Sequence, residues 1–161
     1  MKIGVISDTH IPERFEHIPE VVLEAFEQVD MVMHAGDLVS LAVLDELKSV
    51  CQRVEAVSGN MDSQAVMRKF PPKQVFNIQG FKIGLMHGSG APVNLVTILK
   101  DAFKNDKPDV IIFGHSHQPM NKLEDGILFF NPGSATDTLL SDASYGIIEI
   151  NQEINAKIIR I

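Results

Sequence analysis

The first sixty residues alternate short apolar runs with segments whose apolar residues recur every three or four positions. The runs have the length of strands, and the intervening segments have the period of amphipathic helices. Strands are predicted at residues 2–7, 31–34 and 53–58, with helices at 20–28 and 41–49. Strands and helices that alternate in this way are typical of a parallel sheet with helical crossovers.

The second half of the chain begins similarly and then changes character. A hairpin around Gly80, a helix opened by Pro92 and a further strand are predicted, at residues 75–79, 82–87, 93–105 and 110–113. Beyond Gly114, tight turns join the apolar runs and favour antiparallel pairing of strands at 120–123, 128–131, 145–150 and 156–161. The whole pattern predicts an α/β fold with two packed sheets covered by helices.

Length and composition favour one domain over residues 1–161. The chain has 161 residues, of which 45% are hydrophobic, and neither a repeat nor a linker divides it. No apolar run approaches the roughly 20 residues that cross a bilayer, and Asp8 interrupts the apolar start before a signal sequence forms. We therefore expect a cytoplasmic protein with no membrane partner. Cys51 is the only cysteine, so an internal disulfide is excluded.

The formal charge of −7 disfavours a polyanionic partner, because long-range repulsion opposes the neutralisation of phosphates. Extended DNA or RNA is therefore not expected as a ligand. Two bound divalent cations would offset more than half of this charge and concentrate positive charge at one place. A small phosphate ester would still be attracted there.

Side chains of the kinds that bind metal ions follow most of the predicted strands. The carboxyl ends of parallel strands meet at one edge of a sheet, where loops converge and ligands bind. The residues that follow the strands can therefore meet in space. They are Asp8, His10, Asp37, Asn60, His87, His115 and His117.

Taken singly, most of these motifs have an ordinary structural interpretation. Asp8-Thr9-His10, Gly36-Asp37 and Ser58-Gly59-Asn60 are all compatible with simple turns. The glycine-rich segment from Gly88 to Gly90 could instead cradle a phosphate at a helix N-terminus. His34 on a strand and His17 in a polar loop are interpreted as a structural and a solvated histidine.

Gly114-His115-Ser116-His117 is more specific, since two imidazoles follow a buried strand only two residues apart. The joint count favours a shared metal site, because independent turns would not place an acid, amide or imidazole after each strand. Four imidazoles, two carboxylates and one amide suit Mn, Fe, Co, Ni or Zn better than Ca or Mg alone. Seven donors exceed the needs of one tetrahedral ion, whereas a bridging carboxylate would give two ions about four contacts each.

The ordered motifs D-x-H, G-D, G-N-x-D, H-G and G-H-S-H resemble those of the calcineurin-like metallophosphoesterases. The match runs from Asp8 to His117 and continues at Asn131-Pro132-Gly133-Ser134. The short loops are similar to the compact bacterial and archaeal phosphodiesterase branch. The resemblance implies a four-layer α-β-β-α sandwich of two mixed sheets flanked by helices, and members that often form homo-oligomers.

The same resemblance assigns the ligands. It implies one ion held by Asp8, His10, Asp37 and His117, and a second held by Asp37, Asn60, His87 and His115. Asp37 would bridge the two ions and Asn60 would contact the substrate phosphate, which makes these two the expected catalytic residues. We expect two divalent ions per chain, with manganese first and Fe, Co, Ni or Zn as alternatives.

The expected function is hydrolysis of small phosphodiesters by a hydroxide held between the two ions. Two departures from the family's motifs limit the inference: Met61 stands where many relatives have a histidine, and Ala135-Thr136-Asp137-Thr138 lacks an arginine. Without a proton donor at position 61, aryl esters should be favoured. The alternatives are a phosphomonoesterase, a metal-free nucleotide-binding module, and a non-catalytic scaffold, as a retromer subunit resembling this family is.

Overall fold

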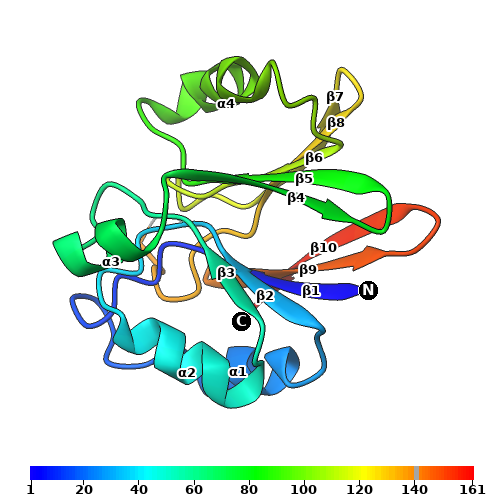
Figure 1. Cartoon of the computed structure of the whole chain (residues 1–161). Coiled ribbons are helices and arrows are strands. Elements are labelled where there is room, and N and C mark those ends of the chain that lie inside the picture. The colour runs from blue at the N-terminus through cyan, green and yellow to red at the C-terminus, as the bar shows by residue number, and fades with distance from the viewer. Residues whose placement is uncertain (140–141) are drawn as a thin grey trace.

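The computed structural model describes residues 1–139 and 142–161. Figure 1 shows two sheets packed face to face, with helices α1 and α2 on one outer face and α4 on the other. Each sheet has five strands and contains both parallel and antiparallel pairs. The predicted α/β sandwich of two mixed, helix-covered sheets is thereby confirmed.

The first sheet has the strand order β10-β9-β1-β2-β3. Its members are β1 (Lys2–Ile6), β2 (Met31–His34), β3 (Val54–Ala56), β9 (Ser144–Ile150) and β10 (Ile154–Arg160). As predicted, β1, β2 and β3 run parallel and β9 pairs antiparallel with β10. β9 also pairs antiparallel with β1. Helices α1 (Glu20–Phe26) and α2 (Ala42–Val50) form the crossovers between the parallel strands.

The second sheet has the order β4-β5-β6-β8-β7. Its members are β4 (Lys73–Ile78), β5 (Phe81–Met86), β6 (Val110–Ile112), β7 (Met120–Glu124) and β8 (Ile127–Asn131). The hairpins β4–β5 and β7–β8 are antiparallel as predicted, but β8 pairs parallel with β6. The tight turn predicted that β7 and β8 pair with each other, but not where this hairpin joins the sheet. β7 lies at the edge of the sheet, so β8 pairs with β6 as a parallel crossover strand.

Alternating side chains of β6 supply two of the three apolar layers. Val110 and Ile112 point between the sheets, whereas Ile111 and Phe113 lie under α4 (Leu95–Phe103) together with Leu99. The third layer lies between the first sheet and helices α1 and α2. Strands buried on both faces therefore hold the site end of the molecule rigidly.

One helix on each outer face inserts a phenylalanine over a strand glycine. A Cβ atom placed on Gly4 of β1 would lie 2.7 Å from the ring of Phe26 on α1. A Cβ atom on Gly84 of β5 would lie equally close, 2.7 Å, to the ring of Phe103 on α4. Any larger residue at either position would clash with the ring unless the ring or its helix shifted.

Two helical segments differ from the prediction. Helix α3 (Gln64–Lys69) was not predicted, because it has six residues and buries only Val66, too little to produce a helical period. The predicted helix at 93–105 begins with a 3₁₀ turn, η1 (Pro92–Asn94), before α4. Among the described residues, no helix is long and apolar enough to cross a membrane.

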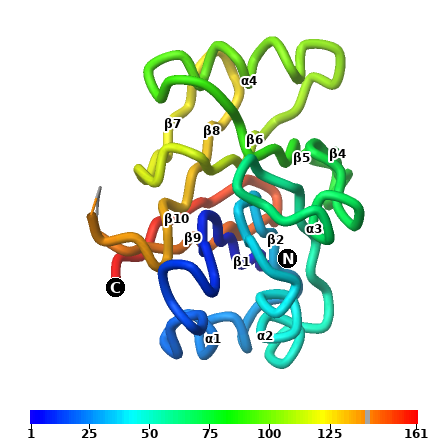
Figure 2. The backbone as a smooth tube through the Cα atoms, turned by 90° about the vertical axis from the view of Figure 1, so that its left-hand side faces the viewer, coloured from blue at the N-terminus to red at the C-terminus, as the bar shows by residue number. Residues whose placement is uncertain are grey.

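The loops that follow β1, β2, β3, β5 and β6 emerge at the same end of the sandwich. This end lies on the left of Figure 1 and faces the viewer in Figure 2. The common end follows from topology, because the parallel strands of each sheet share one direction and the two sheets are stacked. The seven predicted donors all lie in these loops.

Candidate metal centre

The loop after β1 is joined to the loop after β2 through the backbone. The Asp8 amide donates to the Gly36 carbonyl at 3.0 Å, and the His10 amide donates to the Asp37 carbonyl at 3.1 Å. The side chains of Asp8, His10 and Asp37 are all buried. Two donor loops are therefore fixed to each other before any ion binds.

Five of the predicted donors have left-handed backbone conformations. The φ angles are 53° at Asp8, 47° at His10, 56° at Asp37, 70° at His115 and 56° at His117. Residues other than glycine rarely adopt this region, although Asp and His are more tolerant than most. The backbone turns sharply at each donor, which directs the side chains inward and concentrates strain at the site.

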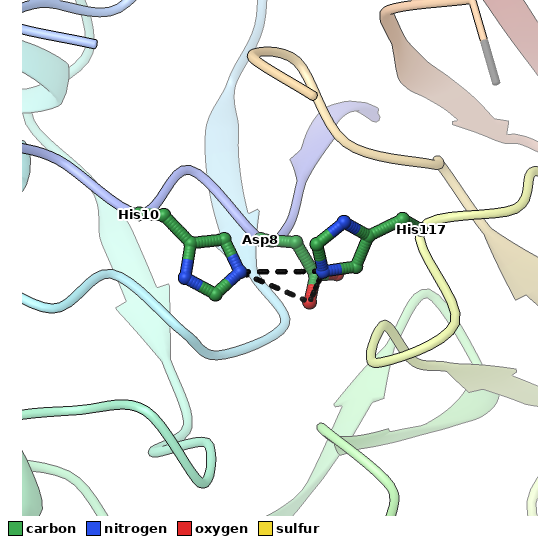
Figure 3. Close-up of side chains that lie close together, drawn as sticks. All are labelled: Asp8, His10 and His117. Carbon is green, nitrogen blue, oxygen red and sulfur yellow. Dashed lines mark hydrogen bonds and ion pairs between the residues drawn. The ribbon is translucent and has the colours of Figure 1, made fainter. Parts of the chain in front are cut away.

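Asp8, His10 and His117 form one compact group (Figure 3). The Nε2 atoms of the two histidines lie 3.2 Å apart. The Asp8 Oδ1 atom lies 3.3 Å from Nε2 of His117 and 4.0 Å from Nε2 of His10. Three potential ligand atoms from the two sheets thus face one small space.

A second group combines Asp8, Asp37 and His87. Nε2 of His87 lies 3.2 Å from Oδ2 of Asp37 and 3.8 Å from Oδ1 of Asp8. Oδ2 of Asp37 also lies 3.8 Å from Nε2 of His10, so its carboxylate adjoins the first group as well. The two groups share Asp8, whereas the resemblance implies that Asp37 bridges the two metal ions. Both carboxylates lie between the two sets of imidazoles.

The neutral tautomer of His87 leaves a bare lone pair directed at the carboxylates. Nδ1 of His87 donates to the Ala35 carbonyl at 2.8 Å, which places the proton of the neutral ring on that nitrogen. Its Nε2 is buried and has no hydrogen-bond partner among the described residues. Nδ1 of His117 donates to the Asp137 carboxylate, and its Nε2 lies within hydrogen-bond distance of Nε2 of His10. In the neutral ring, the bare nitrogen of His87 would repel the carboxylate oxygens that it faces, and a cation between them satisfies both; the residues therefore fit a divalent metal ion.

The pKa values show the same demand for positive charge. Burial alone would lower the pKa of His87, but the neighbouring carboxylates of Asp37 and Asp8 raise it to about 9. Burial alone would raise the pKa of Asp8, yet its hydrogen bond with His117 and the nearby imidazoles hold it below its usual value. Both acids are therefore ionised near neutrality, as metal ligands must be.

Asn60 and His115 lie beside these groups and contact each other. Nδ1 of His115 lies 3.0 Å from Oδ1 of Asn60, and its Nε2 lies 2.9 Å from the carbonyl oxygen of Gly90. The rings of His115 and His87 are perpendicular, with centroids 5.3 Å apart. Asn60 is exposed and His115 is half-buried. The structure thus brings five predicted donors together and places the remaining two at the solvent side.

Asp137 and Arg14 are the residues near the site whose roles the sequence did not reveal. The Asp137 carboxylate accepts hydrogen bonds from Nδ1 of His117 and from the Arg14 guanidinium. It therefore fixes the orientation of His117, a candidate ligand, in an arrangement common around protein-bound metals. The segment after Pro132-Gly133-Ser134 lacks the arginine that the family's motif has there. Arg14 supplies a cation to this segment instead. The two residues are 123 positions apart, so no local motif joins them.

Two further motif residues support the loops from below. Asp62 of G-N-x-D accepts hydrogen bonds from the backbone amides of Asp37, Val39 and Gly59, at 3.1, 2.6 and 2.7 Å. Ser134 donates from its hydroxyl to the Asp8 carbonyl at 2.7 Å. The motifs that looked like turns are therefore hydrogen-bonded to one another.

The remaining histidines and the glycine-rich loop can now be assigned. His34 is buried between the Thr9 hydroxyl and the Gly36 amide, as expected of a structural residue. His17 is 77% exposed and pairs with Glu46. After the loop at Gly88 to Gly90, the chain begins a 3₁₀ turn at Pro92, which has no amide hydrogen for a phosphate. This geometry disfavours the metal-free nucleotide cradle.

A two-sheet α/β sandwich with buried carboxylates and imidazoles clustered at one end is typical of a metallohydrolase. More particularly, the chain belongs to the calcineurin-like phosphoesterase superfamily, whose domain profile matches residues 1–153. The family and its relatives indicate a metal-dependent phosphoesterase.

Three similar proteins illustrate the range of the family. The chain is 44% identical to a probable metallophosphoesterase of Methanothermobacter thermautotrophicus, over 99% of this chain and 92% of that protein. It is 30% identical to a phosphodiesterase of Methanocaldococcus jannaschii, over 95% of each chain. The structure of wild-type Vps29 from Entamoeba histolytica, complexed with zinc, matches with a TM-score of 0.80 at 29% identity, over 99% of both chains.

Proposed function

We propose that this protein hydrolyses small phosphodiesters with two divalent metal ions bound at the carboxylate–imidazole cluster. The observation that carries the proposal is the buried Nε2 of His87, which has no hydrogen-bond partner among the described residues and faces Asp37 and Asp8. A buried ring nitrogen that faces two ionised carboxylates needs a positive charge between them, which a bound metal ion would supply in place of a proton. Manganese is the proposed metal, and the cytoplasm the proposed location.

The chain's own residues would divide the work between holding the ions and holding the substrate. Asp8, His10, Asp37, His87 and His117 would hold the ions, with Asn60 and His115 completing the two sets. Bound divalent ions supply Lewis acidity and lower the pKa of water, so that a nucleophile is available near neutrality. Asn60 is exposed at the edge of the cluster and would orient the phosphate by its carboxamide.

Two features support a preference for diesters with good leaving groups. Arg14, the cation described beside the cluster, is paired with Asp137 and is not free to receive the second charge of a monoester. Met61 is 51% exposed and carries no proton for a departing alkoxide. The Methanocaldococcus jannaschii relative is a phosphodiesterase by name, which also favours a diester substrate.

The non-catalytic scaffold remains the second candidate, because of the likeness to Vps29. A structure of that protein contains zinc, so metal uptake alone does not separate a scaffold from an enzyme. Turnover does. We propose the enzyme because all seven predicted donor positions hold competent donors.

The deciding experiment is a hydrolysis screen of phosphodiesters, cyclic nucleotides and phosphomonoesters with Mn, Ni, Mg and Zn, before and after chelation. His87→Ala serves as the blank, and His17→Ala, which removes an exposed histidine outside the cluster, as its matched control. We expect metal-dependent diester hydrolysis by wild type and by His17→Ala, and none by His87→Ala. Equal rates in all three proteins would reveal a contaminant, and metal binding without turnover would support the scaffold.

A further inference from the structure

A pocket of about 430 Å³ adjoins the metal centre on the side of Asn60 and His87, which form part of its wall. Met67 on α3, Pro72 before β4 and Met86 at the end of β5 supply the apolar side chains of the wall. The wall is completed by Ser58, Gly59, Gly88 and Ser89. Figure 1 shows α3 at the site end of the molecule, beside the strand ends that carry the donor loops. The pocket is therefore continuous with the place where a phosphate would sit.

The composition of the wall restricts what can occupy the pocket. Its lining residues, all of them described, include two thioethers and a proline, and no lysine, arginine, aspartate or glutamate. A second phosphate would find no counter-charge there, and an ammonium group would find no carboxylate. Methionine sulfur makes favourable contacts with aromatic rings and adapts to their shape. The space exceeds the cavity of about 150 Å³ that holds a benzene molecule in another protein.

We propose that this pocket binds an aromatic substituent of the phosphate ester, with the ring against Met67 and Met86 and the phosphate at Asn60. The inference rests on the proposed function, since it assumes that a phosphate occupies the metal centre. It also gives helix α3, which contributes little to the core, a part in substrate recognition. Substrates would be esters of aryl groups or nucleobase-bearing groups in preference to simple alkyl esters.

Binding of two phosphonates to the metal-loaded protein tests the pocket without turnover. Phenylphosphonate and methylphosphonate present the same charged group to the metals and differ only in the substituent. Calorimetry should show phenylphosphonate binding about tenfold more tightly to wild type, because the ring leaves water for an apolar wall. In Met67→Ala, this advantage should fall to about threefold or less, since part of that wall is gone.

Val21→Ala is the matched control, because Val21 lies on α1 outside the pocket and is 47% exposed, as Met67 is. It should keep the full phenyl advantage. Equal binding of the two phosphonates to wild type would overturn the pocket, as would an undiminished phenyl advantage in Met67→Ala. Kinetics provides the second reading: Met67→Ala should raise KM for phenyl esters by a larger factor than KM for alkyl esters.

The outcomes separate this inference from the proposed function. If wild type hydrolyses diesters but does not distinguish phenyl from methyl, the enzyme proposal stands and the pocket fails. If phenylphosphonate binds more tightly in a Met67-dependent manner while no ester is hydrolysed, the pocket stands and the enzyme proposal fails.

Discussion

Asp8 and Asn60 both belong to the candidate metal centre, yet Asp8 is completely buried and Asn60 is exposed. The Asp8 carboxylate accepts hydrogen bonds from the Ser7 hydroxyl at 2.6 Å and from the His115 amide at 3.1 Å. A single hydrogen bond, with His115, is described for the Asn60 side chain. The difference suggests a division of labour in which the buried side holds metal and the exposed side meets substrate.

The largest expected effect comes from the buried side. Asp8→Asn keeps the size of the side chain but removes the charge that both donor groups share. Metal content should fall to near zero, and activity should fall by about 10³-fold, because bound metal supplies several kcal/mol of transition-state stabilisation. Metal analysis and steady-state kinetics check this. Asp101→Asn, an exposed change on α4, should match wild type; full metal content in Asp8→Asn would refute the assignment.

The exposed side should respond differently. Asn60→Ala removes a group that acts on the substrate phosphate, so kcat/KM should fall by about 10²–10³-fold, as for other electrostatic stabilisers of a transition state. Metal content should stay close to that of wild type, because five donors remain clustered. Asn155→Ala, exposed and remote from the cluster, is the control. A loss of metal as large as that of Asp8→Asn would erase the distinction between the two sides.

The support of the buried side gives a smaller effect. Asp137→Asn removes the charge that orients His117, while the ligand atoms themselves stay in place. Metal affinity or activity should fall by about 10–100-fold, the usual consequence of losing such a partner. Metal titration of the variant measures the change, with Asp101→Asn again as control. An unchanged affinity would mean that the Asp137 contact contributes only to packing.

The smallest effect concerns stability alone. Burial holds the pKa of His34 at about 3, below its ordinary value of 6.5. Between these values the unfolded chain binds more protons than the folded one, so the free energy of unfolding decreases as the pH falls below about 6.5. His34→Gln should flatten this decline, and urea unfolding at pH 7.5 and pH 5 measures it. The exposed His17→Gln should retain the wild-type slope, and parallel slopes for all three proteins would contradict the prediction.

The parts of this molecule that the sequence predicts are those that repeat a local pattern. The apolar period of the sequence predicts β1, β2, β3 and the helices between them, and parallel strands must end at one edge. That rule was enough to nominate Asp8, Asp37 and His87 as neighbours although they are far apart in the chain. The family motifs then supplied the expected partition into two ions.

What the sequence did not predict depends on tertiary placement. Helix α3 has six residues and one buried side chain, so its signal is indistinguishable from a loop. The parallel pairing of β8 with β6 depends on where a hairpin docks and not on the hairpin itself. In the sequence, Asp137 cannot be distinguished from an ordinary acidic loop residue. In the fold, it lies between Arg14 and His117.

The left-handed backbone at five of the donors has an evolutionary consequence. Each such residue costs of order 1 kcal/mol or more, and a glycine in its place would relax the turn. Selection for a function that needs the donors must therefore oppose the gain in stability that their replacement would bring. A descendant that no longer needed the donors could gain stability by losing them.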